Sequence, residues 1–139
     1  MAHTSEAAPA SRTTSLVTAL RVTATLTVVV LAWQFVTAGG LIKPSGASPA
    51  LDLHGTGAIA LHVVSGLTMI AAALVWRAGA ALWPTIVAAL VFVLSFVQAY
   101  LGDDATLYLH VPGALVLTIG AVLVAGWAFS RGVVVGRRG

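Results

Sequence analysis

Long apolar stretches separated by short polar ones make up most of this 139-residue chain. A helix needs roughly 20 apolar residues to cross about 30 Å of hydrocarbon, and four stretches reach that length. They are residues 22–42, 53–76, 80–101 and 106–130. Helix-breaking residues separate the four stretches. These breakers are Lys43–Gly46, Arg77–Gly79 and Gly102–Asp104. The pattern predicts an all-α integral membrane protein, folded as an up-down four-helix transmembrane bundle.

The composition excludes a soluble globule. Hydrophobic residues make up 59% of the chain and charged residues 8%, whereas soluble domains carry about 25% charged residues. The length allows one domain. Residues 1–15, rich in Ala, Ser, Thr and Pro, predict a disordered cytoplasmic tail. We expect residues 16–131 to form the membrane domain and residues 132–139 a short basic cytoplasmic tail.

Basic residues predict the orientation in the membrane. The segments on one side of the bilayer carry six arginines, and the loops on the other side carry Lys43 alone. The six are Arg12, Arg21, Arg77, Arg131, Arg137 and Arg138. By the positive-inside rule, both termini are expected in the cytoplasm, with the protein multi-pass in the cell (plasma) membrane. Because the basic residues are scattered at the ends of the segments, nucleic acid is not expected as a partner. The expected partner is the lipid bilayer.

The second half of the chain repeats part of the first. Residues 53–61 read Leu-His-Gly-Thr-Gly-Ala-Ile-Ala-Leu, and residues 109–117 read Leu-His-Val-Pro-Gly-Ala-Leu-Val-Leu. Five of the nine positions are identical. Gln34 and Gln98 hold corresponding places near the ends of the preceding spans. We therefore expect a bundle built from two duplicated helical hairpins.

The repeat places His54 and His110 at equivalent positions on two parallel helices. A helix rises about 34 Å from His54 to Arg77 and about 31 Å from His110 to Arg131, so both histidines are expected near the outer bilayer boundary. His62 is expected about 12 Å further in, without a histidine counterpart. Ionisable groups within membrane spans are costly and usually functional, but a histidine also links helices by hydrogen bonding.

Two facing imidazoles limit the choice of cofactor. The chain has no cysteine, which excludes disulfides, iron–sulfur clusters and thiolate metal sites. Zinc takes four ligands, or three and a water, and the chain offers few carboxylates to complete such a set. Copper lacks ligands in the same way, although His62 and Met69 lie deeper in the membrane. Heme iron needs two axial ligands and accepts imidazole, and four-helix bundles hold cofactors in their cores. The pattern favours heme, with His54 and His110 binding the iron.

Small residues and amides accompany both histidines. A glycine and an alanine follow each histidine at the third and fourth positions, on the same helix face. These residues are Gly57, Ala58, Gly113 and Ala114. They either leave room for a flat macrocycle or let helices approach closely. Gln34 and Gln98 either bond to a ligand histidine or the cofactor, or link helices.

The segments in which Leu-His opens a span and Gly-Ala follows resemble small four-span membrane proteins and one half of heme A synthase. The likeness covers residues 22–130 and is specific around His54 and His110. Each four-span half in that family carries a histidine pair on its second and fourth spans. The resemblance therefore implies a cytochrome b-like bundle with these two residues as axial ligands of a b-type heme. Asp52 precedes His54, but there is no cysteine pair and no second four-span half, so synthase activity is not expected.

The function expected from these residues is electron transfer, heme handling or redox sensing. A single heme near one face does not carry an electron across about 30 Å of bilayer, so a redox partner protein or a quinol-like small molecule is implied. The alternative is a cofactor-free accessory or structural protein whose intramembrane histidines link helices. The only candidate acid–base pair for an enzyme is Asp52 beside His54. No enzymatic role is predicted for the chain by itself.

Overall fold

The structure is a computed structural model that describes residues 7–42, 49–130 and 133. Several sequence predictions lie outside these residues: the first part of the N-terminal tail (1–6), the breaker segment 43–46, and the arginines at positions 131, 137 and 138. Nearly all of the predicted basic tail (132–139) lies outside them as well.

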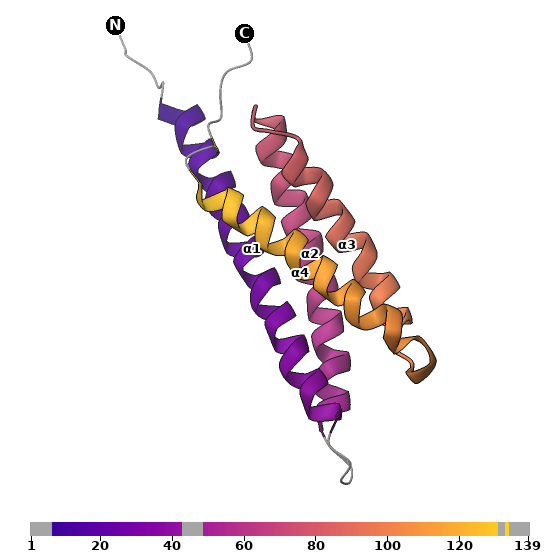
Figure 1. Ribbon diagram of the computed structural model, residues 1–139. Helices are drawn as coiled ribbons and strands as arrows, with labels where there is room; N and C mark the ends of the chain where they lie inside the picture. The colour runs from indigo at the N-terminus through magenta and orange to yellow at the C-terminus, as the bar shows by residue number, and fades with distance from the viewer. Residues whose placement is uncertain (1–6, 43–48, 131–132, 134–139) are drawn as a thin grey trace, which may run out of the picture.

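Four long helices and one short 3₁₀ helix follow one another along the chain. They are α1 (Ala7–Leu41), α2 (Ala50–Arg77), α3 (Trp83–Tyr100), the 3₁₀ helix η1 (Asp104–Thr106) and α4 (Leu107–Phe129). α1 and α2 lie side by side, α3 lies beside α2, and α4 crosses obliquely from α3 to α1 (Figure 1). The predicted all-α, up-down four-helix bundle is confirmed.

All four helices are long and apolar enough to cross a membrane. Only 17% to 33% of each span is buried inside the protein, and the outward faces carry large apolar side chains. Exposing such a continuous apolar surface to water is unfavourable, whereas lipid tails cover it without this cost. The four helices therefore fit a multi-pass membrane protein.

Two helix boundaries differ from the sequence prediction. α1 begins at Ala7, so disorder is wrong for residues 7–15. This stretch has no apolar period, but Leu16 and Val17 pack against the core and anchor the helix. Extending an anchored helix avoids the cost of nucleation. α3 begins at Trp83 and not at 80, with Pro84 in its first turn, where the missing N–H is tolerated.

The turn between α2 and α3 depends on Gly79, whose φ is 110°. The N–H of Ala80 donates to the carbonyl of Val75 at 3.3 Å, and the N–H of Gly79 donates to that of Trp76 at 2.9 Å. This pair of bonds is the Schellman motif, which ends helices at a left-handed glycine. The predicted break at 77–79 is therefore present and has a stereochemical cause.

The helices contact one another in a ring. The backbones of α1 and α2, α2 and α3, α3 and α4, and α4 and α1 approach one another closely, whereas within the described ranges those of α2 and α4 do not. The two histidine-bearing helices, α2 and α4, are thus diagonal across the bundle, as the up-down order predicts. Any group held between them lies on the central axis.

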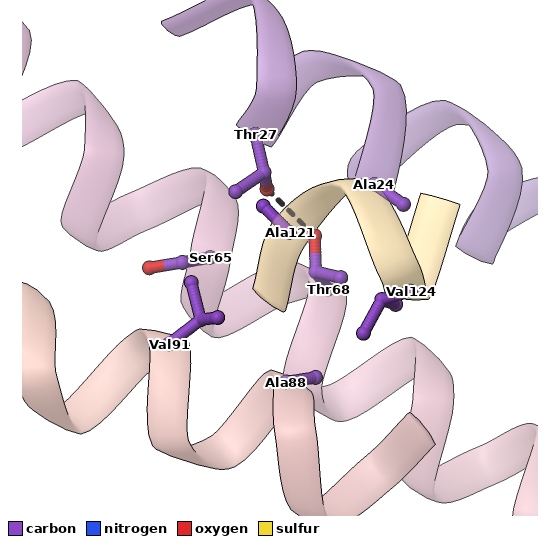
Figure 2. A pocket seen from close by; sticks show the side chains of 8 residues that line it. All are labelled: Ala24, Thr27, Ser65, Thr68, Ala88, Val91, Ala121 and Val124. Atoms are coloured by element: carbon purple, nitrogen blue, oxygen red, sulfur yellow. Dashed lines mark hydrogen bonds between the residues drawn. The ribbon is translucent and has the colours of Figure 1, made fainter. Parts of the chain in front are cut away.

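Residues at equivalent positions of the two repeats line a small void at the centre of the bundle (Figure 2). Eight residues from the four helices line a void of about 10 Å³: Ala24, Thr27, Ser65, Thr68, Ala88, Val91, Ala121 and Val124. In the repeat, a residue of α1 corresponds to the residue 64 positions later on α3, and a residue of α2 to the residue 56 positions later on α4. The first four of these residues therefore correspond, in order, to the last four. The hairpins therefore pack about a pseudo-two-fold axis that runs along the bundle.

Candidate functional site

The rings of His54 and His110 lie beside each other between α2 and α4. Their centroids are 6.3 Å apart and their planes are inclined at 60°. A metal bound to one nitrogen of each imidazole at about 2 Å places the two ring centres roughly 6 Å apart. The separation therefore suits a single ion held between the two rings.

Both histidines have their Nδ1 atom engaged in a hydrogen bond. His110 Nδ1 donates to the backbone carbonyl of Gln98 at 2.9 Å. His54 Nδ1 lies 2.9 Å from Thr37 Oγ1. That hydroxyl has its own acceptors in the carbonyls of Trp33 and Gln34, each 3.1 Å away, so it accepts from the imidazole.

This bonding assigns the same tautomer to the neutral form of both rings, because a carbonyl only accepts hydrogen bonds. Nδ1 carries the proton, and Nε2 carries the lone pair of His54 and of His110. No residue in the described ranges forms a hydrogen bond with either Nε2 atom. Metal-binding histidines use this arrangement, in which the second nitrogen is fixed by a neighbouring acceptor.

The two hairpins differ at this point by one hydroxyl group. In the second hairpin His110 bonds directly to the carbonyl of a glutamine, Gln98. In the first hairpin Thr37 stands between His54 and the equivalent carbonyl of Gln34. Sequence reasoning missed Thr37, because its repeat counterpart is leucine. A hydroxyl three residues after Gln34 was the available signal.

The predicted glycines and glutamines form pairs. A Cβ on Gly57 would lie 3.1 Å from Cδ of Gln34, and one on Gly113 would lie 2.8 Å from Cδ of Gln98. The amides therefore occupy the space beside both glycines. The Oε1 atoms of Gln34 and Gln98 are buried without a hydrogen-bond partner.

Two cavities meet at the histidine pair. One encloses about 280 Å³ between α1 and α4 and is mainly apolar. The other encloses about 530 Å³ between α2 and the end of α3 and is more polar. His54 and His110 line both. Together these cavities exceed the roughly 300 Å³ at which small-molecule sites begin.

The pseudo-two-fold axis relates the two cavities. Gln34 and Ala114 line the first, and their repeat counterparts Gln98 and Ala58 line the second. The axis also exchanges the two histidines, so it passes between their rings. Ala58 and Ala114 line the cavities, whereas Gly57 and Gly113 do not.

His62 lies apart from the pair. Its Nδ1 donates to Ser95 Oγ at 2.8 Å, and that hydroxyl donates to the carbonyl of Phe92 at 2.6 Å. Its ring stacks on Phe96 at a centroid distance of 4.0 Å. His62 lines the more polar cavity with Asp103, which sequence reasoning did not assign to the site. In the part of the chain that the structure describes, no three or more His, Cys, Asp or Glu side chains lie close enough together to hold one metal ion.

Compared with known proteins, the chain matches no family model, no curated protein and no solved structure. Nothing in these comparisons links the chain to heme A synthase.

Proposed function

We propose that this protein binds a b-type heme through His54 and His110 and acts in electron transfer, heme handling or redox sensing. The observation that carries the proposal is the meeting of two repeat-related cavities at imidazoles 6.3 Å apart. Bound heme supplies one-electron chemistry at its iron.

The residues of the chain contribute orientation and the exclusion of water. Thr37 and the carbonyl of Gln98 hold the Nδ1 atoms and leave Nε2 of each ring for the iron. Phe35, Ile42 and other apolar side chains line the cavity between α1 and α4. An apolar surrounding of this kind limits solvent access and influences the potential of a bound iron.

The position of the site implies a partner at one face. The other half of the bundle is a packed core around Leu20, Val75 and Val124, each at most 1% exposed. The central void of about 10 Å³ accommodates one water at most. Electrons therefore enter and leave at the histidine end, through a redox partner protein or a quinol-like small molecule.

Absorption spectra of the purified protein, oxidised and reduced, test the proposal. We expect a low-spin, six-coordinate heme that His54→Ala or His110→Ala abolishes or converts to five-coordinate. His62→Ala is the matched control, since that histidine is hydrogen-bonded elsewhere, and it should keep most of the spectrum. Heme binding that survives both single variants contradicts the proposal.

The second candidate is a cofactor-free accessory protein. The observation in its favour is that each histidine already links two helices: His54 to α1, His62 to α3 and His110 to α3. In that case added heme leaves the unfolding temperature of the protein unchanged. The three alanine variants then lose similar stability and differ in no spectral property.

We also propose that the protein lies in the cell membrane with both termini in the cytoplasm, which places the histidine end outside. The arginine bias of the sequence supports this orientation. The chain lacks cysteine, so single cysteines report sidedness directly. Ala105→Cys in η1 should react with an impermeant thiol reagent in intact cells, and Ala78→Cys in the α2–α3 turn should not. The reverse pattern overturns the orientation.

A further inference from the structure

Arg21 belongs to α1 and lies at the end of the bundle opposite the histidines, against the last turn of α4. Its Nε donates to the carbonyl of Ala128 at 2.9 Å, and its Cζ lies 5.4 Å from the centre of the Phe129 ring. The last carbonyls of a helix have no partner within that helix, and a cation there meets the negative end of the dipole. α4 therefore holds this guanidinium in one place.

The guanidinium retains donors that the described protein does not use. Arginine has five N–H donors, and the bond to Ala128 takes the one on Nε. The carboxylates of the described residues are Asp52, Asp103 and Asp104, at the histidine end of the bundle. Both terminal NH₂ groups of Arg21 therefore remain for an anion that comes from outside the described protein.

A groove runs from Arg21 along the outside of the bundle. It encloses about 430 Å³ and is lined by Thr18, Arg21, Val22, Thr25, Leu26 and Phe129. Its apolar members face outward, with Val22 54% and Phe129 61% exposed. On a membrane-spanning helix these side chains face lipid, so the groove opens toward the bilayer.

The depth of Arg21 matches that of a lipid headgroup. Twenty helical residues separate it from Leu41 at the other end of α1, which is about 30 Å, the thickness of the hydrocarbon layer. Trp127, next to Ala128, lies 5.9 Å from Trp83 in an edge-on contact. Tryptophans gather at the membrane–water boundary, which places Arg21 at that boundary as well.

We infer that this groove is a binding site for an anionic phospholipid. The phosphate of the headgroup receives the free N–H donors of Arg21, as guanidinium groups bind phosphate through two parallel bonds. One acyl chain follows Val22 and Leu26 into the bilayer. Basic pockets between transmembrane helices on the cytoplasmic side bind anionic headgroups in this manner. The inference is independent of heme binding.

The test uses the full-length protein in detergent and measures thermal unfolding with added phosphatidylglycerol, phosphatidylcholine or inorganic phosphate. We expect phosphatidylglycerol to bind at least threefold more tightly than phosphatidylcholine, and Arg21→Gln to abolish the difference. Arg12→Gln is the matched control, because Arg12 is an exposed arginine on the same helix outside the groove. Leu26→Trp, which fills the groove while keeping Arg21 and its bond to α4, should also weaken binding.

Three results would overturn the inference. Equal affinity for the two lipids shows that Arg21 does not select an anionic headgroup. If inorganic phosphate stabilises the protein as much as phosphatidylglycerol does, the site binds a free anion and not a lipid. A loss in Arg12→Gln as large as in Arg21→Gln shows only a general charge effect. If Arg21→Gln does not fold, unchanged affinity of Leu26→Trp for phosphatidylglycerol overturns the inference by itself.

Discussion

The side-chain amide of Gln98 on α3 takes the space beside Gly113 on α4, so that a Cβ on this glycine would lie 2.8 Å from Cδ of Gln98. Gln34 and Gly57 form the equivalent contact between α1 and α2. Each hairpin thus closes by packing an amide on a glycine, one helical turn from its histidine.

Gly113→Ala should destabilise the protein by about 1–3 kcal/mol, because the added methyl group takes the space of the Gln98 amide and forces that side chain out of its rotamer. Truncating the amide in the double variant Gly113→Ala/Gln98→Ala should recover most of this loss. Thermal or denaturant unfolding in detergent measures both. Gly126→Ala is the control on the same helix, since nothing lies within 4 Å of a Cβ there. Equal effects of the two alanines would show that the amide contact is unimportant.

Thr37→Val should weaken heme binding about 10- to 100-fold, which is the usual effect of removing a group that orients a metal ligand. Valine keeps the shape of threonine but cannot accept the proton of His54 Nδ1. Titration of the apoprotein with heme measures the affinity. Thr37→Ser retains the hydroxyl and should bind normally. A Thr37→Val protein with unchanged affinity and lower stability would assign Thr37 a purely structural role.

His62→Ala should lower stability without altering the heme spectrum. The variant loses the hydrogen bond to Ser95 and the stacking on Phe96, and a hydrogen bond contributes about 0.5–1.5 kcal/mol. Ser95→Ala should cost a comparable amount, because it leaves Nδ1 of His62 without its acceptor. Unfolding and absorption are measured on the same samples. A folded His62→Ala protein without six-coordinate heme would move the iron ligand to His62.

The double variant Thr27→Val/Thr68→Val should be within about 1 kcal/mol of the wild type, because replacing both partners of a buried hydrogen bond by apolar groups of the same shape is nearly neutral. The two hydroxyls lie 2.9 Å apart at the centre of the bundle (Figure 2). The second hairpin already has Val91 and Val124 at the equivalent places. Denaturant unfolding checks the prediction, and a loss above about 2 kcal/mol would contradict it.

The sequence by itself determined the number of helices, their apolar character and the breaks between them. These features depend on local properties: the length of an apolar stretch, a left-handed glycine at position 79, and a proline in the first turn of α3. The repeat also predicted that His54 and His110 belong to equivalent helices. Up-down order then made these helices diagonal, because sequential antiparallel neighbours are joined by short loops.

Only the tertiary structure decided what surrounds the two histidines. Glycine in a helix is compatible with a bound macrocycle, a close helix or a neighbouring side chain, and the spacing of Gly57 and Gly113 does not distinguish them. The answer came from the packing of the two helices of each hairpin, which brings Gln34 and Gln98 against the glycines. The bond between His54 and Thr37 likewise joins residues 17 positions apart on two helices. Helical periodicity assigns a residue to a face, but the rotation and crossing of packed helices decide which faces meet.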